Sequence, residues 1–421
     1  MLDPSQALEQ ILARIPGPLG TESVPLARAR GRSLAAEVLS DVDLPPFEKS
    51  AMDGYAVRAS DFSGGAFVDP SAGGETEHEL PCVGESRAGE PFGGAMPPYS
   101  CVAIFTGAEL PQGANAVVMV EHTTRTGSRV TFRGAPKAGQ NVSHRAEILS
   151  VGRPVFAPRR RLSPVDLSVL AAVGAEPVSV FRRPRVSILT TGDELVPVTS
   201  TPGVGQIREG NTWFLRAACE ALGCEVVRSE IVRDDASALE LAFRAALDDG
   251  DALITTGGVS VGKYDLVGPT LERIGVTPVL HKVAIKPGKP IWFGVRPPKP
   301  GKEAVPKPVF GLPGNPVSAL LGFEVFVRAA LSRLAGMPIA DERERRRLGR
   351  WRGRDVTARD RQTNLPCLVG QGTDGVTELE PLPWKGSADI VALTAAGGLV
   401  IVPPATTLQA GALASYRPLA F

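Results

Sequence analysis

Three short glycine-containing segments could bind an anion, because each follows a run of apolar residues that is typical of a buried strand. They are TTGDEL (190–195), TTGGVSVG (255–262) and GLPGNPVS (311–318). Gly257 and Gly258 would let backbone amides approach an anion closely. Ser318 would lie in the first turn of a helix, where free amides and the helix dipole favour phosphate. Each turn could be purely structural, but three in one sheet favour a ligand-binding edge.

None of these turns completes the Walker A pattern of P-loop nucleotide-binding proteins. GGVSVGK ends at Lys263, but Tyr264 stands where a Ser or Thr would hold Mg²⁺. A mononucleotide kinase or ATPase of that class is therefore disfavoured.

A further segment, HKVAIKPGKPIWFG (281–294), is basic and conformationally restricted. Lys286 and Lys289 flank a turn that prolines and a glycine restrict, and Lys282 lies just upstream. A rigid dibasic loop suits a tetrahedral oxyanion such as phosphate, sulfate or molybdate. The alternative is that these lysines are simply solvated. The apolar character of the flanking KVAI and PIWF sequences weakens that alternative.

Carboxylates follow the same predicted strand ends and could hold a divalent cation. They are Asp193, Glu194, Asp234, Asp235 and Asp265. Acids beside a phosphate pocket usually bridge to the phosphate through a divalent ion, most often Mg²⁺. For Asp234, Asp235 and Asp265 the alternative is helix N-capping, because each precedes a helical segment. Both roles can coexist.

The segment DLPPFEKSAMDGYAVRASD (43–61) has the pattern of neither a plain helix nor a plain strand. Two prolines and the Lys49–Ser50 pair precede Met52, Asp53 and Gly54. We interpret it as a shaped loop that displays Asp53, which makes it a candidate functional loop.

The elements that must position these residues follow from hydrophobic periodicity. From Arg185 onward, apolar strand-like runs alternate with helical segments, which predicts a parallel α/β sheet. The helices are expected at 211–223, with Asn211 as N-cap, and at 237–250, 265–275 and 316–336. Upstream, helices are expected at 4–15, 25–39 and 163–173. Residues 55–150 predict a small β domain, and the sequence after Arg350 predicts another.

Composition indicates a soluble, globular, multidomain protein. The chain has 421 residues, 43% apolar and 22% charged, which suggests two to four domains at roughly 100–200 residues each. The net charge of +1 indicates neither nucleic acid nor an anionic membrane as partner. The basic runs 159–161, 182–183 and 345–347 lack interleaved aromatic residues and are interpreted as solvated surface.

The cysteines and the N-terminus indicate a reducing compartment, and we expect the cytoplasm. The five cysteines are odd in number and spaced unlike metal ligands, so we interpret them as reduced core residues. The sequence MLDPSQALEQIL lacks the basic head of a secretory signal. The most apolar stretch, 390–404, is short and interrupted by Gly and Pro, so no membrane span is expected.

Six segments together resemble one known family. They are DLPPFEKSAMDGYAV, IFTGAELPQGANAVVMVE, TTGDEL, TTGGVSVGKYD, VAIKPGKP and FGLPGNPVSALLGFE. In sequence and order they resemble the molybdopterin molybdenumtransferases, the MoeA/gephyrin E-domain family, over nearly the whole chain. The first segment, and KPGKP followed by GLPGNPVSA, are highly specific. TTGGVSVG is shared with related molybdopterin-binding domains.

The resemblance implies an elongated homodimer with an α/β plus β, multidomain fold. Residues 1–50 and 145–182 would form a discontinuous helical and strand domain, and 51–144 a β lid. Residues 183–337 would form the molybdopterin-binding α/β domain, and 338–421 a C-terminal β-barrel.

The implied reaction takes adenylyl-molybdopterin and molybdate as substrates. Mg²⁺ would promote hydrolysis of the adenylyl phosphoanhydride, molybdate would enter the dithiolene, and AMP would leave. The upstream molybdopterin adenylyltransferase is a possible delivery partner. Two alternatives stay open: a pterin-binding scaffold or carrier of the same family, and a pterin adenylyltransferase or nucleotide pyrophosphatase built on the same α/β domain.

The resemblance also implies roles for individual residues. The catalytic set would be Asp53, Thr106, Glu194, Asp234 and Asp265, with the four acids handling Mg²⁺. Asp53 and Thr106 would approach from the lid, across the dimer interface. The substrate-binding set would be Gly257, Gly258, Ser260, Lys282, Lys286, Lys289, Pro313, Gly314, Asn315 and Ser318. Arg361 and Ser387 are further candidates for the oxyanion pocket.

The chain departs from the family pattern at two positions. The family usually has Gly-Glu-Asp-Ile where this chain has Ala146, Glu147, Ile148 and Leu149, so Ile148 replaces a functional acid. An isoleucine can neither ligate Mg²⁺ nor accept a hydrogen bond. Either Glu147 substitutes, or the acid is dispensable, or activity is reduced or altered. Gly210 likewise stands where the family usually has Ser.

Overall fold

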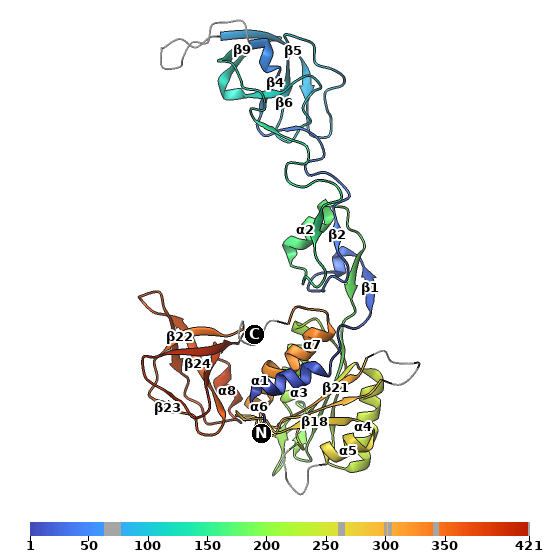
Figure 1. Cartoon of the computed structure of the whole chain (residues 1–421), viewed down its shortest axis with the longest axis vertical. Coiled ribbons are helices and arrows are strands. Elements are labelled where there is room, and N and C mark those ends of the chain that lie inside the picture. The colour runs from blue at the N-terminus through green and yellow to red at the C-terminus, as the bar shows by residue number, and fades with distance from the viewer. Residues whose placement is uncertain (63–76, 260–265, 299–300, 302–304, 340–344, 420–421) are drawn as a thin grey trace. The chain divides into compact units, whose positions relative to one another are not determined.

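The computed structural model describes residues 1–62, 77–259, 266–298, 301, 305–339 and 345–419. The chain forms two compact units, in which distant segments of sequence come together (Figure 1). Unit 1 comprises Met1–Ala36, Pro158–Leu167 and Pro177–Phe421, and unit 2 comprises Glu37–Ala157 and Ser168–Glu176. The four domain ranges given above stay a prediction.

The α/β sheet of unit 1 has the strand order β16-β13-β17-β21-β20-β18. Its strands are β13 (Arg185–Thr191), β16 (Glu225–Val232), β17 (Ala252–Thr256), β18 (Thr277–His281), β20 (Trp292–Arg296) and β21 (Lys307–Leu312). β16, β13, β17 and β21 are parallel, as predicted, whereas β20 and β18 run antiparallel to their neighbours. The proline-rich sequence between β20 and β21 has no helical pattern for the crossover that parallel pairing needs.

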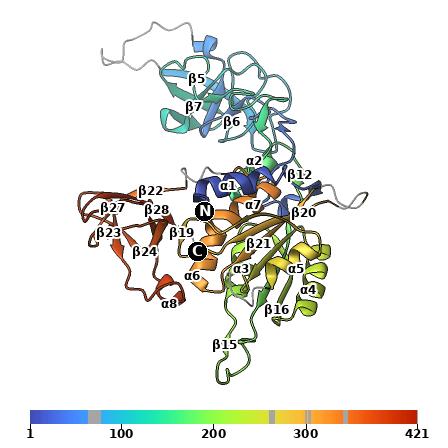
Figure 2. The same ribbon diagram turned by 60° about the horizontal axis from the view of Figure 1, so that its bottom comes forward.

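Helices cover both faces of this sheet (Figure 2). One face packs against α1 (Pro4–Ala13), α3 (Asn211–Ala221), α6 (Pro316–Gly322) and α7 (Arg328–Leu334). The other packs against α4 (Ala236–Asp249) and α5 (Val267–Arg273). Ile188 and Ile254 point to the first face, and their neighbours Leu189 and Leu253 to the second. This alternation explains why the strands are apolar at every position.

Two of the predicted helices differ in the structure. The helix expected at 316–336 consists of α6, a π-helical turn (Phe323–Val327) and α7. The helix expected at 25–39 is wrong. That segment contains only a 3₁₀ turn (Leu26–Arg28) and the short strand β2 (Val38–Leu39). Its amides bond to distant carbonyls instead, from Leu34 to Arg160 and from Ala35 to Ser179, so tertiary pairing overrides the local helical pattern.

A closed β-barrel forms the C-terminal part of unit 1, as predicted. Its strands are β22 (Arg347–Trp351), β24 (Gln362–Gln371), β25 (Thr377–Pro381), β26 (Gly398–Val402) and β28 (Leu413–Pro418). The order β24-β25-β22-β28-β26 closes because β26 also pairs with β24. Trp351, Cys367 and Val400 are buried inside it. The short strand β19 (Ile285–Lys286) adds to β24 and so joins the barrel to the lysine-bearing loop.

Unit 2 is built mainly on a six-stranded sheet with the order β7-β4-β6-β5-β9-β8. Its strands are β4 (Gly54–Val57), β5 (Glu77–Ser86), β6 (Cys101–Ile104), β7 (Ala116–Met119), β8 (Thr123–Thr126) and β9 (Arg129–Arg133). Tyr55, Phe62 and Phe132 form an edge-to-face aromatic core beneath it. The small β domain expected in this part of the sequence is therefore present.

The cysteines behave as core residues. All five are free thiols, and Cys101, Cys219, Cys224 and Cys367 are buried. Burial raises the pKa of Cys101, Cys224 and Cys367 to about 12, so these groups stay protonated at neutral pH. Among the described residues, no helix combines the length and the apolar character that crossing a membrane requires.

Two residues of α4 test how much the sheet depends on this packing. Phe243 is 0% exposed and Leu241 is 74% exposed. Phe243→Ala should lower the free energy of unfolding by about 3–5 kcal/mol, because it removes a buried ring and leaves a cavity. Leu241→Ala should change it by less than about 0.5 kcal/mol. Urea unfolding followed by circular dichroism measures both, and equal losses would contradict the assigned burial.

Candidate functional site

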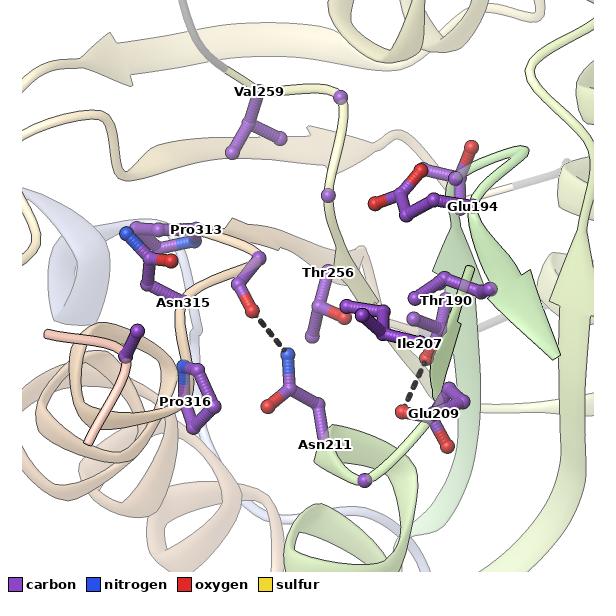
Figure 3. Close-up of a pocket in the computed structure, with 18 of the residues that line it drawn as sticks. Thr190, Glu194, Ile207, Glu209, Asn211, Thr256, Val259, Pro313, Asn315 and Pro316 are labelled. Atoms are coloured by element: carbon purple, nitrogen blue, oxygen red, sulfur yellow. Dashed lines mark hydrogen bonds between the residues drawn. The ribbon is translucent and has the colours of Figure 1, made fainter. Parts of the chain in front are cut away.

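The carboxyl ends of β13, β17 and β21 open into a pocket of about 540 Å³, here termed the strand-end pocket (Figure 3). Parallel pairing brings the three predicted turns to this one edge. The pocket is lined by Thr190, Thr191, Gly192, Glu194 and Asp234, by Thr256, Gly257, Gly258 and Val259, and by Pro313, Gly314 and Asn315, with further residues from 207–211.

The second turn depends on glycine for its geometry. Gly257 has φ +89°, and a Cβ there would lie 2.1 Å from the backbone oxygen of Thr191. Its amide donates to the carbonyl of Leu312 at 3.2 Å. The turn is therefore pressed against the end of β13 and bonded to the end of β21, an approach that a side chain would prevent.

The acids near the pocket divide into two roles. The carboxylate of Asp235 accepts hydrogen bonds from the amides of Ser237 and Ala238, so Asp235 is the N-cap of α4. Asp234 instead accepts a hydrogen bond from the Thr191 hydroxyl and lines the pocket with Glu194. Of the two interpretations open for the Asp234–Asp235 pair, capping thus belongs to Asp235, and Asp234 is available to a ligand.

Two polar residues, Glu209 and Asn211, were not identified from the sequence as part of the pocket. Glu209 is only 6% exposed, and its Oε1 accepts hydrogen bonds from the Thr212 amide at 2.7 Å and the Thr190 hydroxyl at 3.4 Å. Asn211 Nδ2 donates to the carbonyl of Gly314 at 2.7 Å (Figure 3). The prediction of Asn211 as N-cap is wrong, because α3 begins at Asn211 and Glu209 satisfies the Thr212 amide. The sequence signal that could have indicated them is the polar run at 205–211, which precedes the apolar helical segment.

A second pocket, of about 580 Å³, adjoins the first and is termed the lysine pocket. Pro290, Pro313 and Asn315 line both pockets. The cations that line it are Lys286, Lys289, Arg361 and Lys385. The described residues that line it include no Asp or Glu. The lysine pocket is thus suited to an anion, beside a pocket that holds carboxylates.

The barrel completes the lysine pocket. β19 pairs with β24, and Asn364 Nδ2 donates to the carbonyl of Lys286 at 3.2 Å. Asn315 Nδ2 donates to the Ser387 hydroxyl at 3.0 Å. These bonds bring Arg361 and Ser387, the two further candidates for the oxyanion pocket, to the buried side chain of Ser318 in the first turn of α6.

The remaining predicted residues of unit 1 are Lys282, Ser260 and Asp265. Lys282 lines neither pocket; its amide donates to the carbonyl of Ile291 at 2.9 Å. Ser260 and Asp265 lie outside the described residues.

Asp53 and Thr106 come together within unit 2. Both the amide and the hydroxyl of Thr106 donate to Asp53 Oδ1, at 2.7 and 2.8 Å. The hydrogen bond from the Thr106 amide is the main reason that the pKa of the exposed Asp53 carboxyl lies below its usual value, and the hydrogen bond from the Thr106 hydroxyl adds to this effect. Asp53 is therefore ionised at neutral pH and suited to accept hydrogen bonds or to ligate a cation.

Ile148, also in unit 2, is 77% exposed. Its neighbour Glu147 accepts a hydrogen bond from the His144 amide at 3.1 Å, which ties that carboxylate to its own turn.

The donor set of the strand-end pocket fits a magnesium ion. Among the described residues, no three His, Cys, Asp or Glu side chains converge into a metal-binding group. Magnesium does not need one, because proteins usually hold it with one or two carboxylates while water and substrate phosphate complete the shell. Glu194 and Asp234 supply two carboxylates to one pocket.

The glycine turns provide a matched pair for testing the pocket. Gly257→Ala should destabilise the protein by about 1–3 kcal/mol, because the new side chain meets a backbone oxygen and adopts an unfavourable φ. Gly314→Ala should be tolerated, since its nearest atom would be 3.7 Å away. Differential scanning fluorimetry compares the two, and equal melting temperatures would show that the Gly257 turn is not constrained as described.

Comparison with known proteins agrees with this geometry. Residues 2–174 match the family described as "MoeA N-terminal region (domain I and II)", and residues 187–333 match "Probable molybdopterin binding domain". A molybdopterin molybdenumtransferase of Haemophilus influenzae is 38% identical over 337 residues, which cover 80% of this chain and 78% of the relative. Molybdopterin molybdenumtransferase 2 of Mycobacterium tuberculosis is 35% identical over 75% of this chain and 76% of its own.

Solved structures agree over the full length. Two crystal structures of the molybdopterin biosynthesis MoeA protein of Pyrococcus horikoshii superimpose with TM-scores of 0.79 and 0.81. Their sequence identities are 30% and 27%, and the matches cover 99% and 100% of both chains. The likeness to these structures covers the turns, the lysine loop and the barrel, and the bacterial relatives are 35% and 38% identical over at least three quarters of the chain. The chain therefore belongs to the molybdopterin molybdenumtransferase (MoeA) family.

Proposed function

We propose that this chain inserts molybdate into adenylyl-molybdopterin, with release of AMP, to give the molybdenum cofactor. The observation that carries the proposal is the pair of adjoining pockets of opposite character. The strand-end pocket contains Glu194 and Asp234, and the lysine pocket contains four cations with no carboxylate among its described lining residues. Such a pair suits a phosphoanhydride substrate beside a second, dianionic substrate.

The lysine pocket is the proposed site of molybdate. Lys286, Lys289 and Arg361 would bind the tetrahedral dianion, and Ser318 and Ser387 would donate hydrogen bonds to its oxygens. The absence of carboxylates from the described lining means that no like charge opposes the anion there.

The strand-end pocket is the proposed site of the pterin and its phosphoanhydride. Backbone amides of Gly258 and Gly314 can approach phosphate oxygens closely. Gly257, whose own amide bonds to Leu312, would let the substrate approach the turn without meeting a side chain. Pro313 and Asn315 form the wall shared with the lysine pocket. Holding both substrates across one shared wall would replace a random encounter with a defined geometry. Ser260 belongs to the proposed set by family resemblance. We propose no substrate contact for Lys282, which lies outside both pockets.

Magnesium is the proposed cofactor, held by Glu194 and Asp234, with Asp265 and Asp53 assigned by family resemblance. When bound, it would neutralise charge on the phosphoanhydride. Hydrolysis consumes a water molecule and releases AMP, and the pterin keeps its terminal phosphate. The ionised Asp53 would accept a proton or a hydrogen bond, and Thr106 would hold its carboxylate in place.

Family resemblance supports three further proposals. The chain would act as a homodimer in which Asp53 and Thr106 of one subunit complete the pockets of the other. It would work in the cytoplasm, and it would receive its pterin substrate from the molybdopterin adenylyltransferase.

A pterin-binding scaffold or carrier is the second candidate function. The observation that favours it is Ile148, an exposed apolar residue where the family usually has a functional acid. A carrier would keep the strand-end pocket and bind the pterin without releasing AMP.

A turnover assay with adenylyl-molybdopterin, Mg²⁺ and molybdate tests the proposed reaction. AMP release that depends on molybdate is expected. Lys289→Gln should raise the KM for molybdate by about 10–100-fold, because it removes a charged donor. Lys137→Gln, which neutralises an exposed lysine of unit 2 outside both pockets, is the control. Tight pterin binding without AMP release by the unmodified protein would instead establish the carrier.

Replacing Ile148 tests the missing acid. Ile148→Asp should increase turnover and strengthen the response to low Mg²⁺, because it restores a carboxylate at an exposed position. Ile148→Asn introduces a side chain of nearly the same shape as Asp but without its charge, and it should change turnover and Mg²⁺ dependence little. Turnover measured across a Mg²⁺ titration decides the matter: if Ile148→Asp leaves both turnover and Mg²⁺ dependence unchanged, the acid is dispensable in this chain.

A further inference from the structure

A third pocket, of about 760 Å³, lies in unit 1 and shares no lining residue with the strand-end and lysine pockets. Six of its nine lining residues are arginines, and we term it the arginine pocket. They are Arg28, Arg30, Arg32, Arg182, Arg183 and Arg185. Residues far apart in the sequence meet here, so this site could not be anticipated from the Arg182–Arg183 run alone.

Two of these arginines are structural and fix the walls of the pocket. Arg32 is buried, pairs with Glu22 and donates to the carbonyl of Phe181 at 2.8 Å. Arg182 forms a bidentate pair with Asp251, at 2.8 and 2.9 Å. The Arg32 contact with Phe181 thus joins the two segments that carry the arginines, and the Arg182–Asp251 pair anchors the second segment at the start of β17.

The other four guanidinium groups have no such partners. Arg28, Arg30, Arg183 and Arg185 are exposed, and their side chains make no hydrogen bond or ion pair with any described residue. The lining carboxylates are Glu22, which is engaged by Arg32, and the exposed Glu225. The pocket therefore has an excess of positive charge in a chain whose net charge is only +1. Concave geometry concentrates that field.

The chemistry of the lining indicates the class of ligand. Planar guanidinium groups match pairs of phosphate oxygens in a bidentate manner. None of the described lining residues is aromatic, and Ala27 is the single apolar one, so the pocket offers no aromatic ring for a nucleobase and its lining is dominated by charge. We propose that the arginine pocket binds a multivalent oxyanion of the condensed-phosphate class, at a site separate from the proposed reaction.

Calorimetric titration with inorganic tripolyphosphate, in the absence of Mg²⁺, tests this site in the full-length chain. The Lys286→Gln/Lys289→Gln variant serves as background, because it removes two of the four cations of the lysine pocket and so weakens anion binding there. Binding should persist in that background. Adding Arg30→Gln/Arg183→Gln should weaken it by about tenfold or more, since two charged forks are lost.

The matched control is Arg354→Gln/Arg359→Gln in the same background. Both are exposed arginines of unit 1 outside the arginine pocket, so the net charge changes equally. Arg30→Lys/Arg183→Lys keeps the charge but loses the planar forks, and should weaken binding less than the Gln pair. No binding in the background variant would overturn the proposal. So would equal weakening by the pocket and control pairs, which would show a general charge effect.

Discussion

Parallel pairing of β13 with β17, and of β17 with β21, is the constraint on which the proposed site depends. Thr190 pairs with Thr256, and Thr256 with Leu312, so the three strands end at the same edge and their turns open together. The parallel backbone ladder holds this alignment. Gly257 then lets the middle turn approach the end of β13 more closely than any side chain would permit. The parallel pairing of β13 with β16, which places Thr191 opposite Val232, likewise brings Glu194 and Asp234 to the same pocket.

A second attachment sets the chemistry beside that edge. The β19–β24 pairing and the Asn315–Ser387 and Asn364–Lys286 hydrogen bonds hold the barrel against the α/β sheet. The result is a cationic pocket next to a carboxylate-containing one, with Pro313 between them. Under the proposed function, a cation held by the carboxylates would offset their repulsion of the phosphoanhydride, and the molybdate dianion would face the cations of the lysine pocket.

Unit 2 arranges its own functional candidates independently of unit 1. Thr106 orients the Asp53 carboxylate and lowers its pKa through bonds made entirely within unit 2. This is preorganisation in the physical sense, since the carboxylate need not be deprotonated or reoriented to accept a ligand. Ile148 stands in the same unit where the family resemblance implies an acid, and turnover of the Ile148→Asp variant would show whether the reaction needs a carboxylate there.

Local sequence determined the family, the classes of element, the three glycine turns and the dibasic loop, because periodicity and turn chemistry depend on neighbouring residues. Only the tertiary structure decided which distant residues share a wall. Glu209, the Asn211–Gly314 contact and the cluster of Arg28 and Arg30 with Arg183 all arise from long-range packing. The wrongly expected helix at 25–39 has the same cause, because amides of that segment donate to the distant carbonyls of Arg160 and Ser179 and not to carbonyls within a local helix.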